Sequence, residues 1–395
     1  MTQVGLGGRA DIHSAATLSN FFCCRPVDRG NFNKLCDLLC LDPQVVGEPP
    51  QATSLATERR APSNSSSAIC RSGEDAWYEM LLEDHSLIRI QAPVQFGKTL
   101  LMNRMLYYAE QQGHLSLYVT LNGIAAAYYS DTPTFFRHFI CEIQNELEDS
   151  YLDRLMSLAE YDRHAREMTP FKAAIKYLEH FQKQIAVPFT LGINKLDRLL
   201  DDPRHAETAS EFLYLLRFMN EKSKAGKAWQ QFRLILAYSA LRFEDTIPIV
   251  DNKSPFNVGS PIDLREFDPG EVAELATKKG LVLDERQIQL LMELVGGIPS
   301  LIQLALNTVR ERGAALLADA TAMSSIYQDC LEDLAAKDLA SLMRQIATSE
   351  MEITSLDRQE RSLLHRRGLI ITKERLIVPR CELYRRYFAM VEGRG

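Results

Sequence analysis

Apolar residues follow two alternating patterns from about residue 73 onward. Short apolar runs have the length of buried strands, and they cover residues 87–92, 115–121, 188–193, 232–238 and 262–264. The run at 115–121 is consistent with a fully buried position in a parallel sheet. Stretches with helical spacing lie between the runs. Strands that alternate with helices predict an α/β fold built on a parallel sheet, with ligands bound at the carboxyl ends of the strands.

Two of the helical stretches have clear faces or boundaries. One stripe at helical spacing consists of Phe135, Phe139, Ile143 and Leu147. Thr169 and Pro170 predict an N-cap followed by a first-turn proline. The inner face expected for the helix that they open is Phe171, Ile175 and Leu178.

The chain becomes mainly helical after the last strand. A capping box at Asp268 and Glu271 opens the first of three helices, and the other two cover residues 288–295 and 301–309. These helices predict a lid at 266–332.

The connection between the last two of these helices has two interpretations. It contains two glycines and a proline, as Gly-Gly-Ile-Pro at 296–299. It is either a tight turn or a GxP motif, in which Gly297 and Pro299 pack against an adenine base.

Residues 333–395 combine helices with a terminal hairpin. The pattern is helical until Gly368, and two short strands follow at 369–372 and 376–378 before a final helix at 383–391. This order predicts a winged helix. Such a module either binds DNA or packs on a nucleotide-binding domain, and we favour the second role.

The first 72 residues form two further parts. Residues 1–47 carry two short segments with helical spacing, which predict a small helical module. Residues 48–72 are rich in proline, serine, alanine and threonine without periodicity, which predicts a flexible linker. The core domain would then span residues 73–265.

Composition and charge narrow the function classes. The 395-residue chain has 46% apolar and 25% charged residues, which is ordinary for a globular protein. Its net charge of −7 disfavours nonspecific nucleic-acid binding by the whole chain. No apolar run approaches the roughly 18 residues of a membrane span, and no signal segment opens the chain. We therefore expect a cytoplasmic protein without a membrane partner.

The cysteines point to neither a disulfide framework nor a zinc site. Eight cysteines are scattered along the chain without a CxxC pair and without histidines at metal-ligand spacing. Most lie within apolar helical patterns, so we expect reduced, buried thiols.

The strongest chemical signal is the sequence APVQFGKT at 92–99, which joins the first strand to a helix. It matches the GxxxxGK[ST] pattern of a P-loop, with Ala92 at the first position. Gly97 lets the backbone N–H groups curl around a phosphate, Lys98 would reach the outer phosphates, and Thr99 would hold Mg²⁺. A purely structural lysine is the weaker account, because a cation there opposes the helix dipole. The candidate nucleotide-binding residues of this loop are Ala92, Pro93, Gln95, Phe96, Gly97, Lys98 and Thr99.

The end of the third strand decides which chemistry the site supports. P-loop ATPases carry an aspartate for Mg²⁺ there, with an acidic neighbour that activates water. This chain has Asn194 and Lys195 instead, a change of about three charge units beside the γ-phosphate. We expect hydrolysis to suffer more than binding, and Lys195 could compensate a phosphate directly.

The same residues allow a second interpretation. Residues 194–197 read NKLD, which matches the guanine-recognition signature NKxD of GTPases. Against it, no DxxG lies between the P-loop and Asn194, and Ala92 replaces the leading glycine. A GTPase remains the alternative at this point.

The N-terminal module resembles the second half of a Cro-like helix-turn-helix domain, in a version common in cyanobacterial regulators. The residues that carry the resemblance are Thr17, Leu18, Phe21, Phe22, Pro26, Val27, Arg29, Asn31, Phe32, Cys36, Leu39, Leu41 and Asp42. It implies DNA binding, with Arg25 and Arg29 as candidate contacts. A helical docking module without DNA contact is the alternative.

From about residue 73 to 390 the chain resembles the AAA-like domain proteins of cyanobacteria, relatives of the signal-transduction ATPases with numerous domains. The motifs that carry this resemblance are APVQFGKT at 92–99, LDRL at 196–199, SPFNVG at 254–259, GGIPSL at 296–301 and PRCELYRRYF at 379–388. The family pattern implies a core that binds ATP or ADP with Mg²⁺, a helical lid and a C-terminal winged helix.

The chain departs from this family pattern where hydrolysis would occur. Val94 stands for the usual arginine, Asn194 and Lys195 for the acidic pair, and Ile298 and Ser300 for a histidine and a tyrosine. The leading hypothesis is an ATP-binding switch or scaffold with weak or absent ATPase activity, which acts on a protein partner or a second copy. The rival hypothesis is a DNA-binding regulator with a vestigial P-loop.

Overall fold

The computed structural model describes Lys34 and the residues 71, 73–147, 149–185, 187–225, 229, 231–239, 258–318 and 337–390. The chain divides into two compact units, Met1–Arg60 and Ala61–Gly395. All contacts below belong to the second unit. Apart from Lys34 and Arg71, the predicted N-terminal module and linker lie outside the described residues, as do the candidate DNA contacts Arg25 and Arg29.

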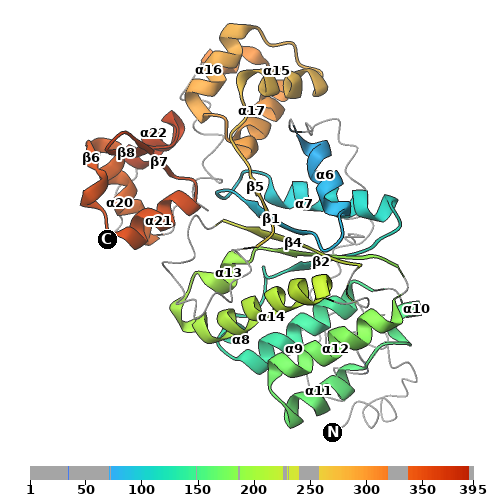
Figure 1. Ribbon diagram of the computed structural model, residues 1–395. Coiled ribbons are helices and arrows are strands. Elements are labelled where there is room, and N and C mark those ends of the chain that lie inside the picture. The colour runs from blue at the N-terminus through green and yellow to red at the C-terminus, as the bar shows by residue number, and fades with distance from the viewer. Residues whose placement is uncertain are drawn as a thin grey trace. The chain divides into compact units, whose positions relative to one another are not determined.

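A five-stranded parallel sheet forms the centre of the second unit (Figure 1). Its strands are β1 (Leu87–Gln91), β2 (Leu115–Thr120), β3 (Phe189–Asn194), β4 (Phe232–Tyr238) and β5 (Ser260–Asp263). They lie in the order β2-β3-β4-β1-β5. All five strands were predicted within two residues of their ends, and the α/β class with a parallel sheet is confirmed.

The burial predicted for the second strand was wrong. Strand β2 lies at an edge of the sheet, and only Leu117 and Val119 of its residues are buried. The fully buried strands are β3 and β4, which lie side by side between β2 and β1. An apolar run alone does not reveal strand order, because edge and central strands use the same residue types.

Helices cover the two faces of the sheet (Figure 1). Helices α6 (Glu74–Leu82) and α7 (Lys98–Gln111) pack on each other, and α7 also contacts β1 to β4. The helices seen on the opposite face are α9 (Thr132–Asn145), α12 (Pro170–Gln184) and α14 (Ala206–Ala225). The connecting helices are α8 (Ala126–Tyr129), α10 (Asp149–Leu152), α11 (Leu158–Glu167), α13 (Asp197–Leu200) and η1 (Pro203–His205).

The N-cap of α12 was predicted correctly, but its inner face was only partly right. The Thr169 hydroxyl accepts a hydrogen bond from the Lys172 N–H at 3.4 Å, and Pro170 opens the helix. The buried residues are Ala173, Ala174, Tyr177, Leu178, Phe181 and Gln182. Phe171 and Ile175 are only half-buried, since Phe171 stacks instead on Tyr214 of α14, with ring centroids 4.8 Å apart.

Three helices follow the sheet, namely α15 (Pro269–Lys278), α16 (Glu285–Val295) and α17 (Pro299–Arg312), with a short η4 (Ala314–Ala318) behind them. The predicted capping box is present. The Asp268 carboxylate accepts from the Glu271 N–H at 2.9 Å, and the Glu271 carboxylate accepts from the Asp268 N–H at 3.0 Å.

The C-terminal module, residues 337–390, combines three helices with a small antiparallel sheet in the order β6-β8-β7. Its helices are α20 (Lys337–Thr348), α21 (Arg358–Arg366) and α22 (Glu382–Met390). Its strands are β6 (Met351–Glu352), β7 (Ile370–Lys373) and β8 (Leu376–Pro379), with η5 (Ile353–Ser355) after β6. The hairpin was predicted. The prediction of helix up to Gly368 was wrong at β6, because a two-residue strand shows no periodicity.

Two cysteines of the described residues, Cys141 and Cys381, are free and buried, as predicted. In the parts of the chain that the structure describes, every helix is too short or too polar to cross a lipid bilayer.

A close backbone contact joins the segment after β5 to the connection between α16 and α17. The Phe267 N–H donates to the Gly297 carbonyl at 2.8 Å. A Cβ atom on Gly297 would lie 2.3 Å from the Phe267 carbonyl oxygen and 2.8 Å from Glu266 Cβ. Only glycine fits at this position, because any side chain would push the two backbone segments apart and break their hydrogen bond.

We expect Gly297→Ala to destabilise the fold by about 1–3 kcal/mol, the usual cost of a forced contact in a packed region. Urea unfolding of the two proteins measures the difference. Gly270→Ala is the matched control, because Gly270 lies in the first turn of α15, where a Cβ meets only the Asp268 carboxylate at 3.3 Å. Equal losses in both variants would contradict the proposed clash.

Candidate functional site

The P-loop, residues 92–99, leaves β1 and enters α7 through two left-handed backbone conformations. Gln95 has φ 74° and Gly97 has φ 86°. Gly97 is the N-cap of α7 and forms no side-chain capping bond, so the first N–H groups of the helix point toward the loop without such a partner. This is the geometry that the GK[ST] pattern predicts, and it suits an anion.

The Lys98 side chain folds back onto the start of its own loop. Its Nζ donates to the carbonyls of Ala92 at 2.8 Å and Pro93 at 2.7 Å. Because an ammonium has three N–H donors, one remains for a phosphate. Burial lowers the pKa of Lys98 to about 8, while Asp197 raises it and Lys195 lowers it further. The side chain therefore lies where an anionic ligand would restore its ordinary pKa.

Thr99 and Asn194 meet in the structure, although they lie far apart in the sequence. The Asn194 Nδ2 donates to Thr99 Oγ1 at 3.1 Å and to the Tyr118 hydroxyl at 2.6 Å. The Asn194 Oδ1 accepts from the Lys195 N–H at 2.9 Å. The end of β3 thus lies beside the hydroxyl predicted to hold Mg²⁺.

These contacts disfavour the GTPase alternative. Guanine recognition by NKLD would require Asn194 and Asp197 to face a base. Asn194 instead contacts Thr99, at the phosphate end of the P-loop. Asp197 is buried, and its carboxylate accepts from the Ser239 N–H.

Sequence reasoning missed Ser239. It directly follows β4 at the carboxyl edge of the sheet and is 4% exposed. Its hydroxyl is buried, and it has no hydrogen-bond partner among the described residues. A polar residue directly after the buried run of β4 was the available signal.

The helices α15 to α17 reach the P-loop through α17. The Ser300 N–H, in the first turn of α17, donates to the Gln95 carbonyl at 3.3 Å. The predicted GxP residues Gly297 and Pro299 therefore lie next to the loop, and Pro299 is buried.

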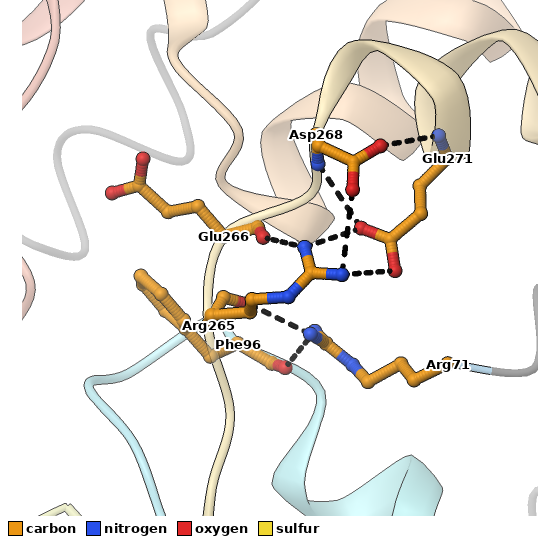
Figure 2. Close-up of polar contacts among 6 residues, drawn as sticks. All are labelled: Arg71, Phe96, Arg265, Glu266, Asp268 and Glu271. Atoms are coloured by element: carbon orange, nitrogen blue, oxygen red, sulfur yellow. Dashed lines mark hydrogen bonds and ion pairs between the residues drawn. The ribbon is translucent and has the colours of Figure 1, made fainter. Parts of the chain in front are cut away.

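Arg71, which precedes α6, contacts both the P-loop and the segment after β5 (Figure 2). Its guanidinium donates to the carbonyls of Phe96 at 3.1 Å and Arg265 at 2.7 Å. It also lies over the Phe267 ring, 4.8 Å from the centroid. Arg265 in turn pairs with Glu271, with Nη1 2.8 Å from Oε2, so the segment between β5 and α15 is held on both sides.

The C-terminal module contacts the P-loop directly. The Val94 N–H donates to the Arg366 carbonyl at 3.0 Å, and the Tyr384 hydroxyl donates to the Gln95 Oε1 at 3.4 Å. The Arg366 side chain forms an ion pair with Asp201, which follows α13.

The module also covers the loop by close packing. Gly368 has φ 73°, and a Cβ there would lie 3.1 Å from Pro93 Cβ and 3.4 Å from the Val94 carbonyl oxygen. Arg380 lies over the Phe96 ring at 5.3 Å and pairs with Glu266 at 2.7 Å. The packing agrees with the predicted role of this module as a partner of the core. Its individual contacts had no local signal.

The parallel sheet, the glycine–lysine–threonine loop and its phosphate-directed N–H groups define a P-loop NTPase. The chain belongs to the AAA-like domain family, whose model matches residues 56–390. It carries an AAA-like ATPase domain. No curated protein matches the chain in sequence.

Solved structures share the fold at low sequence identity. A Walker-type ATPase of Pyrococcus abyssi is 13% identical with a TM-score of 0.55, over 81% of this chain and 95% of that one. The ORC2 protein of Aeropyrum pernix, solved in ADPNP and ADP complexes, is 15% identical with a TM-score of 0.50, over 80% and 91% of the two chains.

We expect the Asp201→Asn variant to loosen the contact between the C-terminal module and the P-loop. Losing one ion pair of about 1 kcal/mol should raise hydrogen exchange at the Val94 amide about fivefold, because that amide is protected by the Arg366 carbonyl. Mass spectrometry of the loop peptide measures it. The control is Glu221→Gln, which removes the exposed Arg217–Glu221 pair of α14. An unchanged Val94 rate in Asp201→Asn would show that the pair does not hold the module.

Proposed function

We propose that the chain binds ATP or ADP at its P-loop and works as a regulatory switch or scaffold with weak or absent hydrolysis. One observation carries the proposal. The backbone that would hold the phosphates is also held by Arg71, by Ser300 of α17 and by Arg366 of the C-terminal module. A ligand in the loop therefore acts on several parts of the chain at once.

The choice of an adenine nucleotide rests on two arguments. The family pattern implies ATP, and the ORC2 protein of similar fold was solved with ADPNP and ADP. In this chain, Gly297 and Pro299 lie beside the loop and would contact the base, while Gln95 to Thr99 would hold the phosphates.

Weak hydrolysis follows from the residues at the end of β3. A general base must accept a proton from water, and neither the Asn194 amide nor the Lys195 ammonium does so. Asp197 is the next carboxylate along the chain, but it is bound to the Ser239 N–H. Nucleotide binding needs only the loop, so this site can bind a nucleotide without hydrolysing it.

The switch would work through the C-terminal module, which we assign as a winged helix packed on the nucleotide domain. Its Arg366 carbonyl accepts the Val94 N–H, and its Tyr384 hydroxyl donates to Gln95. A phosphate that reorients this loop changes the strength of both contacts. A partner protein, or a second copy of the chain, would bind the surfaces released.

The first prediction concerns ligand binding. ATP or ADP at 100 times its Kd should stabilise the fold by about 2.7 kcal/mol, which is visible as a shift in Tm. Thermal unfolding with ATP, ADP and GTP measures this. Lys98→Ala removes the phosphate-directed ammonium and should abolish the shift, and a matched Lys278→Ala on the surface of α15 should keep it. Equal shifts in wild type and Lys98→Ala would refute binding at the P-loop.

The second prediction concerns turnover. We expect phosphate release from ATP by the wild type to equal that of Lys98→Ala, because the residues at the end of β3 are an amide and an ammonium, which cannot act as a general base. A coupled phosphate assay at saturating ATP measures the rate. Turnover that disappears in Lys98→Ala would overturn the proposed loss of hydrolysis and leave the binding proposal intact.

A further inference from the structure

The donor set beside the P-loop does not suit Mg²⁺. This hard cation prefers oxygen ligands in an octahedral arrangement, with carboxylates supplying its negative charge. The two residues at the end of β3 carry an amide, which contacts Thr99, and an ammonium. Asn194 brings no charge, and Lys195 brings a positive one.

Hydrogen bonds already engage the Asn194 amide. Its Nδ2 donates to Thr99 Oγ1 at 3.1 Å and to the Tyr118 hydroxyl at 2.6 Å. Its Oδ1 accepts from the Lys195 N–H at 2.9 Å and from the Thr99 hydroxyl at 3.4 Å. Both polar atoms of the amide are thus engaged, and an amide supplies no negative charge to a cation. The residues present therefore do not fit the metal that the fold family implies.

Lys195 is held in an unusual backbone conformation at this position. Its φ of 59° is left-handed, a conformation that is unfavourable for a residue with a Cβ atom. Such strain persists only where the surroundings enforce it, and it gathers at binding sites. Here the Asn194 Oδ1 fixes the Lys195 N–H, and the next residue is also fixed, since the Leu196 N–H donates to the Ala237 carbonyl at 3.2 Å.

The charges around the loop are arranged for an anion. Lys98 is buried against two carbonyls, and the charge of Lys195 acts on it across the site. Asp197 is the carboxylate whose charge acts on Lys98 from nearby, and it is bound to a backbone N–H. Two ammonium groups thus oppose one engaged carboxylate.

We propose that this site binds the phosphates of a nucleoside di- or triphosphate without a divalent cation, with the positive charge of Lys195 replacing the charge that Mg²⁺ supplies in related ATPases. The inference rests on the proposed nucleotide binding and specifies its chemistry. An ammonium neutralises the outer phosphates without the coordination geometry that Mg²⁺ requires, and it repels a metal ion that arrives with the nucleotide.

The wild-type protein provides the first test. A fluorescent ADP or ATP analogue is titrated with the full chain in EDTA and then in excess Mg²⁺, at equal ionic strength. We expect binding in EDTA to be at least as tight as in Mg²⁺. Binding that needs Mg²⁺ would overturn the inference. Because this test uses only the wild-type protein, its result does not depend on whether a variant folds correctly.

A charge reversal provides the second test. Asn194→Asp with Lys195→Glu places two carboxylates at the end of β3, and we expect this variant to bind at least about tenfold more tightly with Mg²⁺ than in EDTA. Lys172→Glu, at an exposed lysine in the first turn of α12, changes one charge elsewhere and should behave like the wild type. Metal dependence that is the same in the double variant and the wild type would refute the role of Lys195.

The two proposals fail in different ways. If no nucleotide binds in either buffer, and Lys98→Ala gives the same signal as the wild type, nucleotide binding itself is refuted. If nucleotide binds only with Mg²⁺ and Lys98→Ala abolishes it, nucleotide binding stands and the metal-free site is refuted.

Discussion

The backbone between Pro93 and Gly97 is the constraint on which the rest of the structure depends. It passes through two left-handed conformations, one of them at a glutamine, and such a path holds only when its surroundings fix it. Arg71, Ser300 and Arg366 supply that support from three separate parts of the chain. The loop is therefore both a ligand site and the joint at which the parts of the unit meet.

Under the proposed function, the site binds phosphate with little or no hydrolysis, and the two activities depend on different residues. Phosphate binding depends on backbone N–H groups and Lys98, which belong to the loop and its helix. Hydrolysis depends on side chains at the end of a strand two positions away in the sheet, where Asn194 and Lys195 stand. Substitution of the second set leaves the first intact, because the Asn194 amide still bonds Thr99 and keeps β3 against α7.

Local chemistry made much of the fold predictable from the sequence. The capping box at Asp268 and Glu271 depends on two residues three positions apart. The ends of the strands can likewise be predicted from apolar runs of a few residues. Strand order leaves no such signal, so the edge position of β2 was missed, as was the two-residue β6. The contacts that hold the P-loop could not be predicted from the sequence either, because the Arg366–Asp201 pair joins residues 165 positions apart.

The close approach of Gly368 to Pro93 has a genetic consequence. Any side chain at Gly368 must displace either the loop or the C-terminal module, since a single methyl group would already lie 3.1 Å from Pro93 Cβ. Substitutions there would act as a wedge and separate the two parts without touching a phosphate-binding atom. Under the proposed switch function, a screen for permanently signalling alleles should therefore recover substitutions at Gly368.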